Sequence, residues 1–235
     1  MSVNGGPNIS ENGLIFSLDA ADRTSYPGTG TAWNDLVGNN NGTLTNGPTF
    51  NSGNKGSIVF DGVDDYSLRN SSLNLGDNFS VFAWVKPGNI NIRNGIVGNS
   101  YTYNERQGFF FATGTNYSTS SNTFFMSIGA DIAYGTAVNN TVTSNRWNYL
   151  GGTVSNGGGE IKLYVDGRQV NLAPLSLFTS GNITYTTNQL LIGGRVLSSP
   201  EPWIGNIGLV QMYNRILTSD EILQNYNNTK SRFGL

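Results

Sequence analysis

Short apolar segments, separated by runs of Gly, Asn and Ser, recur along the whole chain. Residues 160–165 alternate strictly, which places Ile161, Leu163 and Val165 on one side of a predicted strand. Asp166 and Gly167 follow and are typical of a two-residue hairpin turn. Segment 79–85 is apolar or small at nearly every position, which predicts a strand covered on both faces. Further strands are predicted at residues 14–18, 57–60, 108–112, 123–128, 147–154, 190–193 and 207–213.

One helix is predicted near the end of the chain, over Thr218–Asn228. Thr218 and Glu221 have the spacing of a capping box, in which each side chain caps the other residue's backbone N–H. Many short strands and one terminal helix predict an all-β fold, a two-sheet antiparallel jelly-roll sandwich. With no long linker, we expect one domain over residues 1–235, with short polar tails at Met1–Ser10 and Lys230–Leu235.

Six aromatic residues test this arrangement. Phe109, Phe110 and Phe111 are consecutive, so they cannot all face the same core. Trp84 and Trp147 lie within predicted strands and are expected to be buried. For Trp203, packing in the core or against another subunit is favoured over exposure at the rim.

The amino-acid composition excludes several kinds of catalytic, metal-binding and nucleic-acid-binding site. The chain has no His and no Cys, which excludes Ser-His-Asp and Cys-His catalysis, structural zinc and disulfides. A metal would need oxygen ligands, so calcium comes before magnesium. The net charge is −2 and the 13 Lys and Arg residues are scattered, which argues against nucleic acid. No apolar run approaches the ~18 residues of a membrane span, and residues 1–10 do not resemble a signal peptide.

Four blocks, in order along the chain, resemble the laminin-G-like, concanavalin-A-like lectin/glucanase superfamily. They are Ser57–Tyr66 with its Phe-Asp-Gly and Asp-Asp-Tyr, Phe79–Pro87, Trp147–Val170, and the closing segment from Trp203 to Ile222. The resemblance implies a jelly roll that hosts hydrolases, lectins and assembly modules. The opening segment, Leu14 to Phe50, is similar to modules in tail and capsid-surface proteins of bacteriophages, which implies a location on the virion.

Hydrolysis by this fold would need two or three carboxylates facing a cleft from one strand, as the resemblance implies. Asp64 and Asp65 are adjacent, so on a strand they would point to opposite faces. We therefore expect no enzymatic activity, with a carboxylate glycosidase as the remaining outside alternative. The five Glu residues lie far apart, at Glu11, Glu105, Glu160, Glu201 and Glu221.

A calcium ion is expected at most once, on oxygen donors near the rim of the sandwich. The predicted ligands are Asp19, Asp35, Asn39 and Asn41, because a short loop can wrap an ion with such side chains. The alternative is that these residues cap turns. The family often has an acidic pair after the closing Gly-x-Ile, where this chain has Gly208 and Leu209. For Asp61, Asp64 and Asp65, a structural role in a turn is favoured.

Carbohydrate binding is predicted at a polar hairpin. Tyr101, Tyr103, Asn104 and Arg106 place two rings, an amide and a guanidinium within six residues. Such a cluster offers a stacking surface together with partners for sugar hydroxyls. The expected function is a phage virion surface module that binds cell-surface carbohydrate or decorates the particle. A purely structural decoration protein, contacting other virion proteins or copies of itself, remains the alternative.

Overall fold

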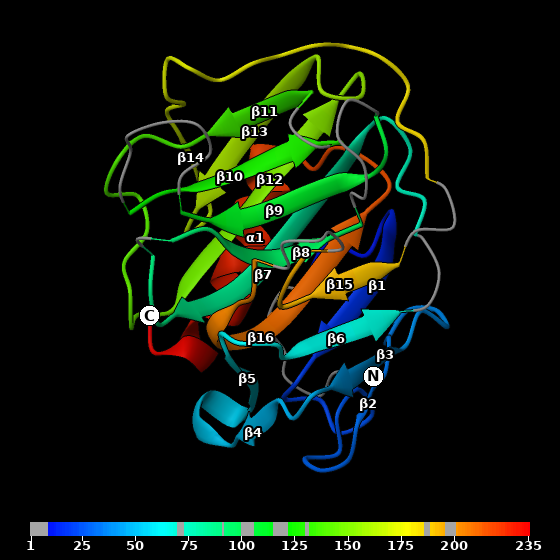
Figure 1. The fold of residues 1–235 in the computed structure, drawn as a ribbon, viewed down its shortest axis with the longest axis vertical. Helices are drawn as coiled ribbons and strands as arrows, with labels where there is room; N and C mark the ends of the chain where they lie inside the picture. Colours follow the sequence, from blue (N-terminus) through cyan, green and yellow to red (C-terminus); the bar gives the residue numbers. More distant parts are fainter. Residues whose placement is uncertain are drawn as a thin grey trace.

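The computed structural model describes residues 9–69, 73–90, 92–99, 106–114, 122–129, 132–185, 189–195 and 201–235. Two antiparallel sheets of eight strands each lie face to face, as Figure 1 shows. Sheet A contains β1 (Leu14–Asp19), β4 (Thr49–Asn51), β5 (Ser57–Asp61), β7 (Phe79–Pro87), β12 (Asn148–Ser155), β13 (Glu160–Val165), β14 (Arg168–Val170) and β16 (Ile204–Tyr213). Sheet B contains β2 (Ala32–Trp33), β3 (Gly42–Thr45), β6 (Tyr66–Arg69), β8 (Asn94–Gly98), β9 (Phe109–Thr113), β10 (Phe124–Ile128), β11 (Ala133–Thr136) and β15 (Leu190–Ile192). The predicted two-sheet antiparallel sandwich is confirmed.

The long strand β16 organises sheet A. One of its edges pairs with β7, while the other pairs with β5 in its first part and with β1 in its second. The register shifts between Ile207 and Leu209. Gly208, at this shift, is tightly packed, because a Cβ there would lie 2.8 Å from the ring of Phe233. Its carbonyl also accepts a hydrogen bond from the backbone of Ala20.

The main core fills the space between the sheets. Phe109 and Phe111 point into it from β9, whereas Phe110 lies in a separate cluster on the outer face of sheet B. The prediction that the three rings cannot share one core is confirmed. Trp203 is fully buried in the main core, as the sequence favoured. Asp166 and Gly167 both have positive φ in the turn between β13 and β14, which confirms the predicted hairpin.

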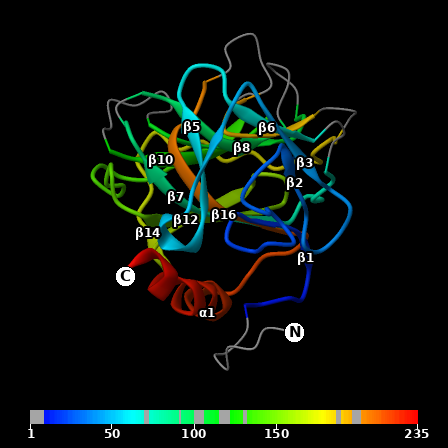
Figure 2. The same cartoon turned by 90° about the horizontal axis from the view of Figure 1, so that it is seen from below.

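The helix α1 (Ser219–Thr229) and the short 3-10 helix η2 (Lys230–Phe233) cover the outer face of sheet A (Figure 2). Thr218 and Glu221 form the predicted capping box. Trp84 stacks on Phe233, with ring centroids 4.2 Å apart, and donates from Nε1 to Thr229 Oγ1 at 2.7 Å. Trp84 and Trp147 are therefore buried as predicted, but beneath the helix rather than between the sheets. No helix in the described part of the chain is long and apolar enough to cross a membrane.

Candidate functional site

The outer face of sheet B has an unusual cover. Phe110 and Phe125 point away from the sandwich interior, yet both rings are fully buried. The guanidinium of Arg93 lies 4.6 Å from the ring centre of Phe125, and that of Arg195 lies 4.6 Å from the ring centre of Phe110. Each guanidinium over an aromatic face is a cation–π contact, which is stronger when the cation is shielded from water.

Glu201 joins the two arginines. Its Oε2 lies 3.0 Å from Arg93 Nε, and its Oε1 lies 3.6 Å from Arg195 Nη1. The side chain of Arg195 is only 1% exposed, so its charge meets this carboxylate out of contact with water. The network fixes the segment that carries Glu201 and Pro202 against sheet B.

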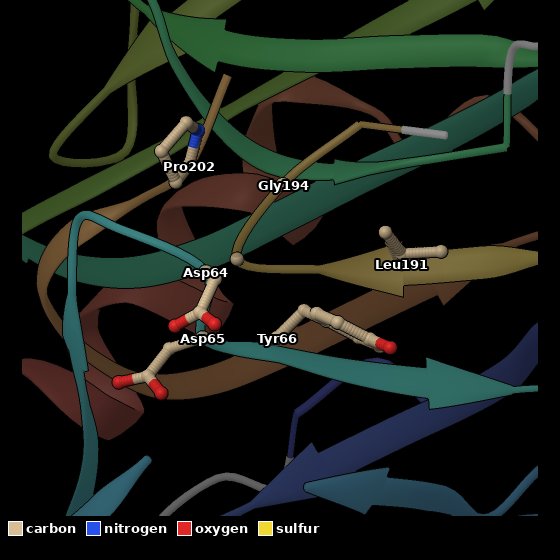
Figure 3. A pocket seen from close by; sticks show the side chains of 7 residues that line it. Asp64, Asp65, Tyr66, Leu191, Gly194 and Pro202 are labelled. Atoms are coloured by element: carbon tan, nitrogen blue, oxygen red, sulfur yellow. The ribbon is translucent and has the colours of Figure 1, made fainter. Parts of the chain in front are cut away.

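Beside this network lies a small hollow (Figure 3), at the end of β6 and β15. It holds about 20 Å³, enough for a water molecule or a single ion. The register places Tyr66 opposite Thr45 and Leu68 opposite Thr43, so these four side chains share the outer face of sheet B. Tyr66 is half-buried and Thr43 is exposed. The hollow is lined by Asp64, Asp65, Tyr66, Leu191, Gly193, Gly194 and Pro202.

Three carboxylates meet at this end of β6. Oxygens of Asp61, Asp64 and Asp65 all lie within 4.8 Å of one another. Adjacent Asp64 and Asp65 approach each other because residues 62–64 form a bend before β6 begins at Tyr66. The expectation that they point to opposite faces is therefore corrected, since it assumed a continuous strand.

Asp65 is the most buried of the three, with 5% exposure. Burial, followed by the nearby charges of Asp61 and Asp64, raises the pKa of its carboxyl group, although a hydrogen bond from the backbone N–H of Asp61 opposes this. Clustered carboxylate oxygens are the donors that calcium prefers, at 2.3–2.6 Å from the ion. Oxygens grouped this closely need only small side-chain movements to surround one ion at such distances. The donor chemistry of this cluster therefore fits a calcium ion.

The four predicted calcium ligands are placed differently. The buried carboxylate of Asp35 accepts from the backbone N–H groups of Ser17 and Val37 at 2.9 and 3.1 Å and from Asn40 Nδ2 at 2.9 Å. Asn41 Oδ1 accepts from the N–H of Asp35 at 2.9 Å, and Asn39 is exposed. These contacts are those of residues that cap a loop.

Asp19 belongs to another set of contacts. Its Oδ1 lies 2.6 Å from Arg232 Nη1 and accepts from the N–H of Ala21. Among the described residues, the acidic groups that come together as a triplet are Asp61, Asp64 and Asp65, and Asp19 and Asp35 are not among them. Calcium at Asp19 and Asp35 stays a prediction.

The predicted carbohydrate site is described only in part. Tyr101, Tyr103 and Asn104 lie outside the described residues. Arg106 donates from Nη1 to the carbonyl of Gly157 and from Nη2 to that of Thr179, both at 2.6 Å. Its guanidinium thus ties two loops together at the edge of the sandwich.

Residues 60–223 match the family Laminin_G_3, described as the concanavalin A-like lectin/glucanases superfamily. The chain belongs to this superfamily. No curated protein sequence matches the chain.

Solved structures share the fold at low sequence identity. Domain 4 of AbnA, a GH43 extracellular arabinanase from Geobacillus stearothermophilus in complex with arabinotriose, is 16% identical with a TM-score of 0.68; the match covers 92% of this chain and all of that one. Trypanosoma rangeli sialidase in complex with sialic acid is 14% identical with a TM-score of 0.65, over 97% of this chain and 35% of that one. The receptor binding domain of botulinum neurotoxin D is 14% identical with a TM-score of 0.64, over 92% and 52%. The chain therefore spans about a third of the sialidase.

These matches correct the expectation that the chain has no enzymatic activity. The same fold occurs within the chains of an arabinanase and a sialidase. The expectation of paired acids on one strand was also too narrow, because Asp61, Asp64 and Asp65 meet across a bend. At 14–16% identity the similarity itself shows only the fold.

Sequence reasoning missed Tyr66 and the Arg93–Glu201–Arg195 network. For Tyr66, the signal was present: it ends the Asp-Asp-Tyr block and begins a strand. For the ion network no local signal exists, because Arg93 and Glu201 are more than a hundred residues apart in the sequence. Strand β8 follows Arg93 and strand β15 precedes Glu201, so the pairing of these two strands brings the residues together.

Proposed function

We propose that this chain binds carbohydrate through the outer face of sheet B, at the surface around Tyr66. The observation that carries the proposal is the half-buried ring of Tyr66 on the outer face of sheet B, where hydroxyl groups and carboxylates flank it. Tyr66 lies opposite Thr45 and lines the hollow that also contains Asp64 (Figure 3).

The chemistry of this surface matches that of a sugar. The ring of Tyr66 offers an apolar face for the C–H groups of a pyranose or furanose, and its hydroxyl can donate or accept. Thr43 and Asp64 are both exposed and offer partners for sugar hydroxyls. The rigid segment next to it, held by Glu201, keeps one wall of the surface in place.

Proteins with this fold support carbohydrate as the class of ligand. One solved structure with this fold is in complex with arabinotriose and another is in complex with sialic acid. A third is the receptor binding domain of a neurotoxin. Because their identities to this chain are low, they support carbohydrate as the ligand class and leave the particular sugar open.

One calcium ion forms part of the proposal. Asp61, Asp64 and Asp65 supply suitable donors next to Tyr66, and an ion there would neutralise three clustered negative charges. It would act as a stabiliser of the bend before β6. Chelation is expected to lower the melting temperature, and Asp64→Asn is expected to remove this sensitivity.

The setting proposed for this binding is the surface of a phage particle. Its support is the resemblance of the opening segment, residues 14–50, to modules of phage tail and capsid-surface proteins. Many copies on a symmetric particle would turn weak single sites into useful avidity. Labelling of intact particles by an antibody against this chain tests the setting independently of any glycan.

A glycan array that includes arabinotriose and sialic acid tests the function. Wild type is expected to bind at least one glycan, and Tyr66→Ala is expected to lose that binding with an unchanged melting temperature. Tyr66→Phe is the matched control, because it keeps the stacking face.

The double variant Tyr101→Ala/Tyr103→Ala tests the hairpin predicted from the sequence. Loss of binding in this variant alone would move the site from Tyr66 to the hairpin. A wild type that binds no glycan but associates with other virion proteins would contradict the proposal and favour the decoration role.

A further inference from the structure

A second hollow lies away from Tyr66, between the β1–β2 connection and the segment formed by β4 and η1 (Gly53–Lys55). It encloses about 180 Å³ and shares no lining residue with the hollow beside Tyr66. β4 lies at the lower end of the molecule in Figure 1. The wall of the hollow includes two aromatic and two cationic side chains, which are Tyr26, Phe50, Arg23 and Lys55.

The aromatic wall is fixed in place. The rings of Tyr26 and Phe50 are 5.4 Å apart between centroids, with their planes at 42°. Tyr26 is only 5% exposed, and its hydroxyl donates to the carbonyl of Gly30 at 3.0 Å. Phe50 is half-buried and packs partly against the main core. The hollow therefore offers a rigid apolar surface beside water.

The two cations at this hollow have no carboxylate partner among the described residues, in contrast to Arg93, Arg195, Arg215 and Arg232. Arg23 and Lys55 are both exposed. Arg23 uses one guanidinium N–H on the carbonyl of Pro27 at 3.1 Å, which leaves its other donors for a ligand.

The acidic groups close in sequence are engaged elsewhere. Asp22 accepts hydrogen bonds from the N–H and the hydroxyl of Thr24, and these bonds lower the pKa of its carboxyl group. Asp19 is paired with Arg232 at 2.6 Å. The positive charge of Arg23 and Lys55 is therefore not cancelled by an ion pair with either acid.

The backbone around the hollow is held from both sides. Arg232 donates to the carbonyls of Asn54 and Gly56, at 3.0 and 2.8 Å, which fixes η1 from the C-terminal side. Gly56 lies so close to the carbonyl of Ala20 that a Cβ would be 2.4 Å from that oxygen. A site held in this way loses little entropy when a ligand binds.

We propose that this hollow binds a sugar residue bearing a carboxylate, such as a hexuronic acid. Arg23 and Lys55 contact the carboxylate, since a guanidinium pairs well with its two oxygens. Phe50, with Tyr26 packed behind it, contacts the C–H face of the ring, and Ser52 at the rim offers a hydroxyl. The volume lies below the roughly 300–1,000 Å³ typical of sites for drug-sized ligands, which suits one monosaccharide unit. This site does not depend on the proposed role of Tyr66.

Backbone amide shifts in ¹⁵N-labelled protein test the proposal, with sodium galacturonate as the probe. We expect saturable shifts at Ala21 and Ser52, which line the hollow. Galactose lacks the carboxylate and acetate lacks the ring, so each is expected to bind at least tenfold more weakly. Phosphate at equal ionic strength distinguishes a general anion site from a sugar acid site.

Two variants of equal charge give the control. Arg23→Gln/Lys55→Gln is expected to weaken galacturonate binding at least tenfold, whereas Lys162→Gln/Arg168→Gln, which removes the same charge elsewhere, is expected to bind like wild type. Phe50→Leu is expected to weaken galacturonate but not acetate. The proposal is overturned by equal binding of acetate or phosphate, by equal weakening in both double variants, or by no saturable shift. None of these outcomes depends on Tyr66, so they are distinguishable from failure of the first proposal.

Discussion

The outer faces of the two sheets present the same physical problem and solve it differently. Both carry aromatic side chains that point away from the main core. On sheet A the cover is apolar: α1 and η2 place Tyr226 and Phe233 on Trp84. On sheet B, the rings of Phe110 and Phe125 are covered by arginine side chains instead.

The difference has consequences for stability and for function. An aromatic cover buries apolar area and needs few polar partners. A guanidinium cover brings charge into a place shielded from water, where the carboxylate of Glu201 lies beside it. In return, the outer face of sheet B keeps polar groups and a half-buried Tyr66 at its surface. Sheet A's outer face is thus closed by an apolar cover, whereas sheet B's outer face is the one on which we propose binding.

The largest expected effect is on the aromatic cover. Trp84→Ala is expected to lower the free energy of unfolding by about 3–5 kcal/mol, because it leaves a cavity beneath α1. Urea unfolding measures this loss. Trp84→Phe is the matched control: it keeps a stacking ring but loses the bond to Thr229, so a smaller loss is expected. A loss below about 1 kcal/mol for the alanine variant would show that α1 contributes little to stability.

The next effect is on the charged cover. Glu201→Gln is expected to lower the free energy of unfolding by about 2–3 kcal/mol, because the buried guanidinium of Arg195 would lose the carboxylate beside it. The matched control is Glu160→Gln, which breaks the exposed pair with Lys162 and is expected to cost less than about 1 kcal/mol. Equal effects of the two substitutions would mean that the arginine cover does not need its acid.

The two faces also differ in how far the sequence predicts them. Strand 160–165, the Asp166–Gly167 turn and the capping box at Thr218 depend on local patterns, and all three were predicted correctly. The cover of sheet A is predicted in part by the sequence, because the apolar stripe of the C-terminal helix must pack against a sheet.

The cover of sheet B was not predictable from local pattern. Arg93, Arg195 and Glu201 have no periodicity in common, and their contact depends on long-range strand pairing. The grouping of Asp61, Asp64 and Asp65 was missed for a different reason, since a short bend reverses the alternation expected of a strand. The arginine cover and the acidic cluster are the parts of this molecule that depend most on such departures.

A pH titration distinguishes the stability contributed by Glu221, at the start of α1, from that of the acidic cluster Asp61, Asp64 and Asp65. The hydrogen bonds from Arg215 lower the pKa of Glu221 to about 2. A carboxyl whose pKa is lowered in the folded state stabilises the protein above its unfolded value of 4.5, and this contribution is lost as the pH falls toward 2. Because the side chain is 26% exposed, we expect about 1–2 kcal/mol at neutral pH.

Glu221→Gln tests this assignment. Glutamine keeps the capping box, so the variant removes the charge and spares the cap. Thermal melts between pH 2 and 7 are expected to show a shallower acid loss than in wild type. An identical acid profile would place the pH dependence elsewhere.

The smallest effect is expected at Asp65 and has the opposite sign. Its pKa is raised in the folded protein, so its ionised form opposes folding at neutral pH, and this cost disappears as the pH falls through the raised pKa. Asp65→Asn keeps an acceptor for the N–H of Asp61 and removes the repulsion from Asp61 and Asp64. In chelator at pH 7 we expect it to raise the free energy of unfolding by less than about 1 kcal/mol. In millimolar calcium we expect wild type to be the more stable of the two proteins, because it keeps the third carboxylate of the cluster. A variant less stable than wild type in chelator would show that the Asp65 charge is compensated by a partner other than a cation.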